Sequence, residues 1–172
     1  MRIAIVGSRG YPYVYSGYET FVAELAPRLV QGGHEVIVYC HRGLFDSRPP
    51  VMNGVRLVYV PALEHKILSQ LSHSFLATLH VACVSRPDVA LYVNSANGPF
   101  GWLLRVARIH SVLNVDGLEW LRPKWKGLGA RYFHWASRVG IRAFNAIITD
   151  AAAMAKIYQA EFGAKSHTNS AW

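Results

Sequence analysis

The fold is decided by the first forty residues, MRIAIVGSRGYPYVYSGYETFVAELAPRLVQGGHEVIVYC (residues 1–40). Apolar, β-prone runs at 2–6 and 35–40 predict two strands. Between them, hydrophobic residues recur at helical spacing from Phe21 to Val30, and Gly32-Gly33 ends the pattern. The order of strand, helix and strand predicts a βαβ unit.

The same alternation continues along the chain. Further strands are expected at 55–60, 89–93, 112–115 and 146–149, and further helices at 67–86, 99–108, 128–144 and 151–162. Crossovers of this length predict an α/β fold with a Rossmann-like, doubly wound parallel sheet and helices on both faces. We expect one domain over residues 1–163 and a frayed tail over residues 164–172.

The composition is that of a folded protein with a basic surface. Of the 172 residues, 52% are hydrophobic and 16% are charged, which excludes intrinsic disorder. Lys and Arg number 18 against 10 Asp and Glu, so the net charge of +8 favours anionic partners. No helix-turn-helix, RRM, KH or OB pattern is present, so we do not expect nucleic acid. Without a leader or an apolar run of membrane-spanning length, we expect a cytoplasmic protein, soluble or peripheral at the inner face of the membrane.

Metal and disulfide chemistry are not predicted. The eight histidines do not pair at metal-ligand spacing: His73 and His80 share a helix face, but no third ligand joins them. Cys40 and Cys83 both lie in apolar runs, and we expect them to be reduced and buried.

Ligands of open α/β sheets bind beyond the carboxyl ends of the strands, so the loops after the first, fourth and fifth strands matter most. The first of them, Gly7 to Thr20, contains three glycines and leads into a helix N-terminus, which suits a phosphate group. A long turn without function explains the same glycines. The loop lacks the G-x-G-x-x-G fingerprint, which disfavours a nucleotide-binding oxidoreductase.

Polar side chains mark the other two loops. Asn94 and Asn97 precede a helix, where they either form a plain turn or hydrogen-bond the hydroxyls of a sugar. Asp116 follows a buried strand, where it either takes or orients the proton of an attacking hydroxyl or forms an Asx turn. Glu119 is the competing carboxylate, with an outward, solvated position as its alternative.

The stretch from Trp120 to Arg142 interleaves aromatic and basic residues, which suits the interface of an anionic membrane. The alternative is that its aromatic side chains belong to the core. The residues that we assign to a membrane or lipid-phosphate surface are Arg122, Lys124, Trp125, Lys126 and Arg131.

Three segments taken together resemble a known family: MRIAIVGSRGYP (1–12), YSGYETFVAELAPRL (15–29) and GHEVIVYC (33–40). They are similar to the N-terminal domain of family 4 GT-B glycosyltransferases. The closest likeness is to the rhamnosyltransferase-type N-terminal domain, which also carries a segment like NVDGLEW at 114–120. The resemblance covers about residues 1–163 and implies one half of a GT-B fold.

The resemblance implies a retaining, metal-independent hexosyltransferase. Such an enzyme moves a sugar from a nucleotide-sugar, which is a co-substrate and not a cofactor, to a glycan or lipid-linked acceptor in surface polysaccharide synthesis. Gly17, with Ser16 beside it, maps to the glycine that contacts the donor diphosphate, and Asp116 maps to the residue beside the reacting sugar. Position alone assigns acceptor binding to Asn94, Asn97, Arg9 and Glu119.

The chain departs from the family pattern at two places. Relatives carry paired glycines where this chain has Ser16-Gly17. Relatives also continue beyond Gly163 into a strand and a C-terminal donor-binding domain, which we expect to be absent here. We therefore expect little or no transferase activity from this chain alone, and a separate C-terminal half as its partner. The alternative is a non-catalytic sugar- or phosphate-binding module that docks on another chain.

Overall fold

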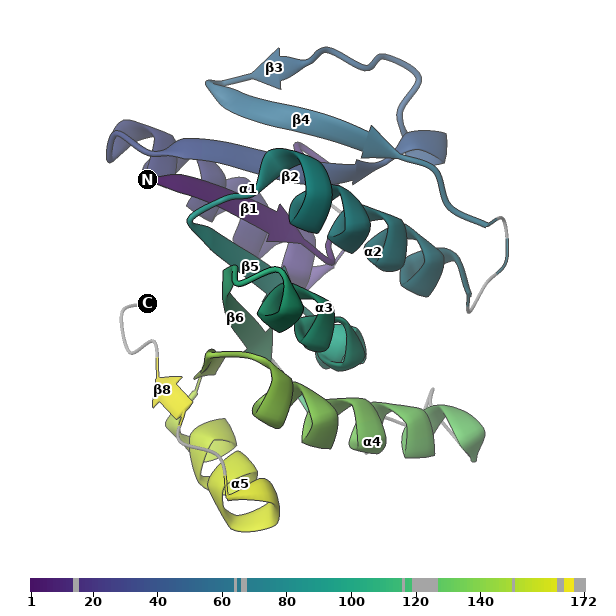
Figure 1. Ribbon diagram of the computed structural model, residues 1–172, viewed down its shortest axis with the longest axis vertical. Coiled ribbons are helices and arrows are strands. Elements are labelled where there is room, and N and C mark those ends of the chain that lie inside the picture. The colour runs from purple at the N-terminus through teal and green to yellow at the C-terminus, as the bar shows by residue number, and fades with distance from the viewer. Residues whose placement is uncertain are drawn as a thin grey trace. The chain divides into compact units, whose positions relative to one another are not determined.

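The computed structural model describes residues 1–13, 16–63, 65, 68–115, 117–118, 127–149, 151–163 and 166–168 (Figure 1). The chain divides into two compact units, Met1–Leu91 and Tyr92–Trp172.

The first unit contains strands β1 (Arg2–Val6), β2 (Glu35–His41), β3 (Val51–Met52) and β4 (Val55–Val60), helices α1 (Gly17–Gln31) and α2 (Leu68–His80), and the turns η1 (Arg42–Leu44) and η2 (Val81–Ser85). β2 pairs in parallel with β1 and β4, and β3 pairs antiparallel with β4. Figure 1 shows α1 and α2 on opposite faces of these strands. Every side chain of β2 from Val36 to Cys40 is buried, as expected for a strand that is covered on both faces.

The second unit contains strands β6 (His110–Val115), β7 (Ala146–Thr149) and β8 (Ser166–Thr168), the 3₁₀ turn η3 (Ser95–Phe100), and helices α3 (Gly101–Val106), α4 (Leu128–Ala143) and α5 (Ala152–Phe162). β7 pairs in parallel with β6 and with β8. Strand β5 (Val89–Val93) contains the boundary between the units.

Helix α4 packs closely on η3 because glycines remove the side chains between them. A Cβ atom on Gly98 would lie 1.9 Å from the Ala136 carbonyl oxygen and 3.0 Å from the Gly140 nitrogen. The Tyr132 hydroxyl donates a hydrogen bond of 2.9 Å to the Ala96 carbonyl oxygen, which fixes α4 on this turn. Burial raises the pKa of Tyr132 to about 12, so this donor keeps its proton across the physiological range.

The predicted α/β fold class is confirmed. The strands predicted at 2–6, 55–60, 89–93 and 146–149 have those bounds. The helix predicted from residue 99 begins earlier, as the 3₁₀ turn η3, and the helix predicted at 67–86 ends in the π-helical turn η2. Hydrophobic periodicity predicts the apolar elements well, and the short β3 and η1 carry too few apolar residues to be recognised this way.

Two predictions are corrected by the structure. Residues Ser166–Thr168, which the sequence analysis assigns to a frayed tail, form β8 on the edge of β7. A three-residue strand has no readable periodicity, but the exposed backbone of β7 supplies hydrogen bonds to it. Cys40 is buried as predicted, whereas Cys83 is exposed because the apolar run at the end of α2 turns one side outward.

Candidate functional site

The loop after β1 is tied to the first turn of α1 by a buried carboxylate. Glu19 is only 4% exposed, and it accepts a hydrogen bond of 3.0 Å from the Arg9 backbone N–H. The Ser16 hydroxyl donates a second hydrogen bond to the same carboxylate, and the Thr20 N–H donates to the Ser16 carbonyl oxygen at 3.1 Å. Glu19 therefore holds both sides of the loop. A serine followed three residues later by a glutamate is the pattern of a capping box, but that pattern predicts bonds to N–H groups of the helix terminus and not the bond to Arg9.

This arrangement leaves the N-terminus of α1 available to a ligand. Ser16 occupies the N-cap position, but its hydroxyl bonds Glu19 and does not cap a backbone N–H. Gly17 is the first residue of the helix. The N–H groups of a first helical turn have no intrahelical acceptor, and the helix dipole adds partial positive charge there. The negative charge of Glu19 opposes an anion at this turn, so Arg9 would have to contribute to binding.

Gly10 allows the loop to pass close to Cys40 and Phe45. Its φ angle is +130°, and a Cβ atom would lie 2.9 Å from the Cβ and Sγ atoms of Cys40 and from a ring carbon of Phe45. Only glycine fits this conformation and this space. Gly10 is therefore explained by packing alone, as the non-functional interpretation of the loop predicts.

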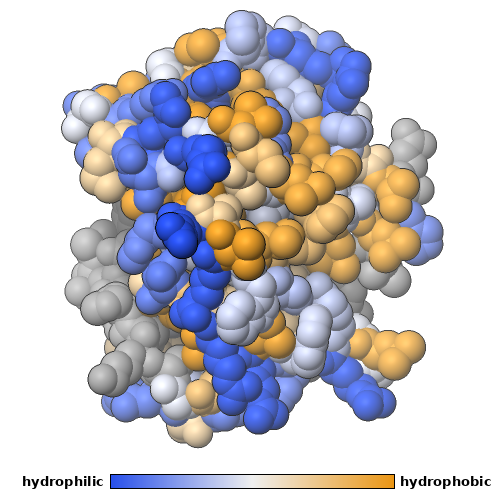
Figure 2. Space-filling view, viewed as in Figure 1, coloured by the Kyte–Doolittle hydropathy of each residue, from blue (hydrophilic) through white to orange (hydrophobic). Residues whose placement is uncertain are grey.

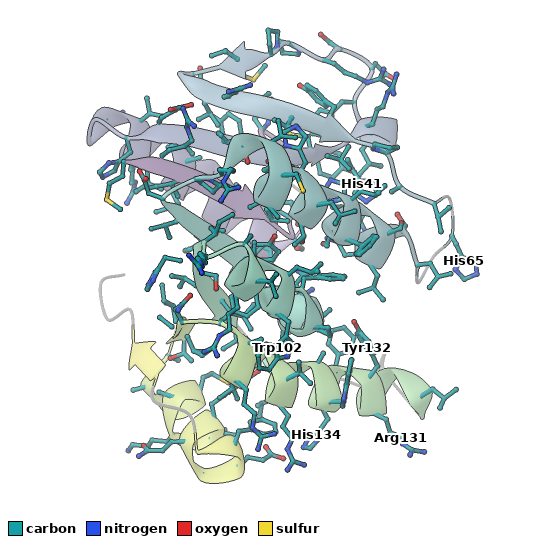
Figure 3. The ribbon with its side chains drawn as sticks, viewed as in Figure 1. His41, His65, Trp102, Arg131, Tyr132 and His134 are labelled. Atoms are coloured by element: carbon teal, nitrogen blue, oxygen red, sulfur yellow. The ribbon has the colours of Figure 1, made fainter. Side chains whose placement is uncertain are left out.

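A pair of stacked histidines lies in the same unit and was missed by the sequence analysis. His41 ends β2, and its ring stacks on that of His73 in α2, with centroids 4.3 Å apart and an interplanar angle of 19°. Figure 3 shows His41 beside α2. The Gln70 amide donates a hydrogen bond of 2.9 Å to the Gly7 carbonyl oxygen, so α2 is also tied to the end of β1. The spacing of the two histidines along the chain carries no indication that they meet.

The histidine pair is neutral at physiological pH. Burial, and then the neighbouring His41, lower the pKa of His73 to about 3. Burial also lowers the pKa of His41, and the positive charge of Arg9 lowers it further. An uncharged imidazole pair can donate and accept hydrogen bonds but does not contribute positive charge to the loop.

In the second unit, Asn94 and Asn97 bond the backbone of their own turn. Asn94 has a φ angle of +77°, and its side-chain oxygen accepts a hydrogen bond of 2.9 Å from the Ala96 N–H. Asn97 is fully buried, and its amide donates a hydrogen bond of 2.7 Å to the Val93 carbonyl oxygen. The Asn97 Oδ1 atom and the Ser95 Oγ atom are buried without a hydrogen-bond partner in the described part of the chain. These oxygens could accept hydrogen bonds from the hydroxyls of a ligand or from water.

Few of the predicted membrane and catalytic residues fall within the described part of the chain. Asp116, Glu119, Arg122, Lys124, Trp125 and Lys126 lie outside the described residues. Arg131 is exposed on α4. Of the neighbouring aromatic residues, Phe133 is buried and Trp135 is 51% exposed. Figure 3 shows Tyr132 and His134 on different sides of α4. The Tyr132 ring contacts the rings of Phe133 and Trp135, so burial of Phe133 draws part of this aromatic cluster toward the core.

No group of three or more His, Cys, Asp or Glu side chains in the described residues could hold a metal ion. Likewise, no helix within those residues combines the length and hydrophobicity needed to cross a bilayer.

The parallel α/β fold, with loops at the strand ends that lead into helix N-termini, is that of a GT-B glycosyltransferase domain. The chain belongs to the glycosyl transferase 4-like domain family, whose model matches residues 16–168. No curated protein sequence matches the chain.

Solved structures of low sequence identity share the fold. Sucrose-phosphate synthase from Thermosynechococcus elongatus matches with a TM-score of 0.70 and 16% identity, over 98% of this chain and 47% of that chain. Os79 from O. sativa, solved in complex with UDP, matches with a TM-score of 0.60 and 10% identity, over 95% of this chain and 51% of that one. A putative UDP-N-acetylglucosamine 2-epimerase from Listeria monocytogenes matches with a TM-score of 0.59 and 13% identity, over 93% and 42% of the two chains. The chain therefore spans about half the length of the first two structures.

Proposed function

We propose that this chain is the acceptor-side half of a retaining, metal-independent glycosyltransferase. The complete enzyme transfers a sugar from a nucleotide-sugar to a glycan or lipid-linked acceptor in surface polysaccharide synthesis. Family membership supports glycosyl transfer as the reaction class. The match to about half of the GT-B structures supports a division of labour, in which a second half binds most of the nucleotide-sugar.

The observation that carries the proposal is the tether made by Glu19. It joins the Arg9 backbone to the Ser16 hydroxyl and so holds the N-terminus of α1 in a fixed position. A preformed helix N-terminus can bind an anion without first ordering the loop. In this proposal the backbone of Gly17 contacts the donor diphosphate, Ser16 positions it, and Arg9 adds positive charge.

Acceptor binding is assigned, as a proposal, to polar residues that follow strands in the sequence. Asn94, Asn97, Arg9 and Glu119 bind the acceptor, and Asp116 takes or orients the proton of the attacking hydroxyl. The unpartnered buried oxygens of Ser95 and Asn97 support a polar ligand near η3. Because the Asn97 amide already bonds Val93, only its Oδ1 atom remains for such a ligand.

The transferase proposal is tested by reconstitution. This chain is mixed with a separately expressed donor-binding half, and sugar transfer from a panel of nucleotide-sugars is measured. We expect transfer only from the mixture, and a loss of about a hundredfold or more in Asp116→Ala, as is typical for general-base catalysis. Glu24→Ala, which changes an exposed carboxylate on α1, serves as the matched control.

Other outcomes of this assay would indicate a different function. Release of free UDP-sugar epimer without transfer indicates an epimerase. Binding of a sugar or phosphate ligand without any turnover indicates a non-catalytic module. Unchanged transfer in Asp116→Ala removes Asp116 from the reaction centre. We also expect this chain alone to bind a nucleoside diphosphate negligibly, which a calorimetric titration measures directly.

We further propose that the complete enzyme works in the cytoplasm at the inner face of the membrane. Arg122, Lys124, Trp125, Lys126 and Arg131 form the contact surface, and exposed Arg131 on α4 is consistent with this role. Co-sedimentation with anionic vesicles tests it. Binding should fall with added salt and in Lys124→Glu with Lys126→Glu, since attraction between surface charges is screened. Binding that ignores both changes refutes the proposal.

A further inference from the structure

A cleft between α4 and α5 is lined by none of the residues that are assigned to the transferase reaction. Its volume is about 230 Å³, and its lining residues are His134, Arg138, Ile141, Arg142, Glu161 and Phe162. All six belong to the second unit. The cleft therefore needs no contribution from the first unit.

The periodicity of α4 places three basic side chains on one wall of this cleft. His134, Arg138 and Arg142 are spaced four residues apart, so they lie on the same side of the helix in successive turns. The other wall comes from α5, where the Phe162 ring lies 5.1 Å from the His134 ring and 5.6 Å from the Tyr158 ring. Packing of Phe162 between these rings gives the cleft a fixed apolar side.

Among the described residues, the lining of the cleft carries two arginines against one carboxylate. Of the described residues that line the cleft, Glu161 alone is a carboxylate, and it lies 3.2 Å from the Nε2 atom of His134. Arg138 and Arg142 make no ion pair or hydrogen bond within the described residues. Helix α4 contains three arginines and no acidic residue. Among the described residues, nothing pairs with these two guanidinium groups, which lie one turn apart and can bind an anion from outside.

The helix dipole accounts for the position of only one of these two arginines. Arg142 lies in the last turn of α4, where a positive charge is favourable. Arg138 lies a full turn earlier, where this effect has faded. Glu161, which could pair with Arg138 across the cleft, bonds His134 instead.

We propose that this cleft binds a phosphate monoester, with Arg138 and Arg142 gripping the phosphate and Ile141 and Phe162 contacting its organic group. A guanidinium group can donate two parallel hydrogen bonds to the oxygens of a phosphate. Two guanidinium groups match the double negative charge of a phosphate monoester better than the single charge of a carboxylate. The apolar wall explains why an ester is expected and not inorganic phosphate. The same chemistry occurs in a soluble sugar or glycerol phosphate and in the headgroup of phosphatidic acid.

The test uses glycerol 3-phosphate as the soluble probe and phosphatidylcholine vesicles, with and without phosphatidic acid, as the lipid probe. The ring protons of His134 report occupancy of the cleft by NMR, and vesicle co-sedimentation reports the lipid. Each of Arg138→Gln and Arg142→Gln should weaken binding about tenfold or more, as expected for a lost charge-assisted hydrogen bond. Lys156→Gln removes the same charge from an exposed position of α5 outside the cleft and should leave binding unchanged.

A third variant should change the affinity in the opposite direction. Glu161→Gln keeps a hydrogen-bond acceptor for His134 but removes the carboxylate charge, so it should tighten binding several-fold. Binding of glycerol 3-phosphate identifies a soluble ester as the ligand class, and binding confined to phosphatidic acid vesicles identifies the lipid. The proposal is overturned if neither probe binds, or if Lys156→Gln weakens binding as much as the arginine variants do. It stands independently of the transferase proposal, because its readouts do not involve sugar transfer.

Discussion

The backbone N–H of Arg9 donates a hydrogen bond of 3.0 Å to the buried carboxylate of Glu19, so the loop after β1 and the first turn of α1 are held as one piece. The donor-binding role proposed for Ser16 and Gly17 depends on this tether. Without it, the N-terminus of the helix would still exist, but its position relative to Arg9 would vary.

Replacement of Glu19 should therefore loosen the loop. In Glu19→Ala the Arg9 N–H and the Ser16 hydroxyl lose their acceptor, and we expect the free energy of unfolding to fall by about 1–3 kcal/mol. Urea denaturation measures this change, and hydrogen exchange of the Arg9 amide should accelerate. Glu24→Ala removes an exposed carboxylate that pairs with Arg28 on the same helix, and it should cost about 0.5 kcal/mol or less. Equal effects of the two variants would contradict the tether.

The stacked histidines predict a loss of stability in acid. Because the folded state lowers the pKa of His73 to about 3, only the unfolded chain takes up this proton between about pH 6.5 and pH 3. The contribution of His73 to the free energy of unfolding should be constant above about pH 6.5. It should fall as the pH drops from about 6.5 to 3, by at most about 1.4 kcal/mol per pH unit for each such histidine. The lowered pKa of His41 adds to the fall.

A comparison of two substitutions isolates this effect. His73→Phe keeps a ring against His41 but cannot take up a proton, so denaturation midpoints measured from pH 7 to pH 4 should change less steeply than in the parent chain. His110→Phe makes the same change at an exposed histidine of β6. The interpretation fails if His110→Phe flattens the profile and His73→Phe does not.

The close contact of η3 and α4 should not tolerate any side chain at Gly98. In Gly98→Ala the new methyl group would overlap the Ala136 carbonyl oxygen, 1.9 Å away, so the two elements must separate. We expect a loss of about 3 kcal/mol or more, at the upper end of overpacking effects. Gly43→Ala is the control, because a Cβ atom there meets nothing within 4 Å. Thermal unfolding followed by circular dichroism compares the two, and a mild effect of Gly98→Ala would mean that α4 packs less closely.

The two cysteines should differ sharply in reactivity. Cys83 is exposed, whereas Cys40 is buried, and burial raises the pKa of the Cys40 thiol to about 11. Since the thiolate is the reactive form, Ellman's reagent should modify one thiol quickly in the native protein and the second only on unfolding. Cys83→Ser should abolish the fast phase, while Cys40→Ser should preserve it. Two fast thiols in the native state would contradict the burial of Cys40.

The exposed apolar side chains of α2 form a surface without an identified ligand. Leu68, Phe75, Leu76 and Leu79 are each more than a third exposed, and Figure 2 shows apolar side chains gathered over this helix. They have the helical spacing that the sequence analysis used to predict α2. The same periodicity that finds a helix therefore does not tell which of its apolar residues are buried, because it contains no information about what covers each face.

The sequence by itself determined the succession of the longer strands and helices, the fold class and the family resemblance. These follow from hydrophobic spacing and from motifs such as those at 1–12 and 33–40, which are local in the chain. Gly17, which the sequence analysis places in a loop, is the first residue of α1, and Asn97 lies in the 3₁₀ turn η3.

Only the tertiary structure decided how these residues are used. It buried Glu19 against the Arg9 backbone, stacked His41 on His73, added β8 to the edge of β7 and opened the cleft between α4 and α5. Each of these features joins residues that lie apart in the chain, from 10 positions for Arg9 and Glu19 upward. Their energies come from burial and from hydrogen bonds across elements, which no local pattern of residues records.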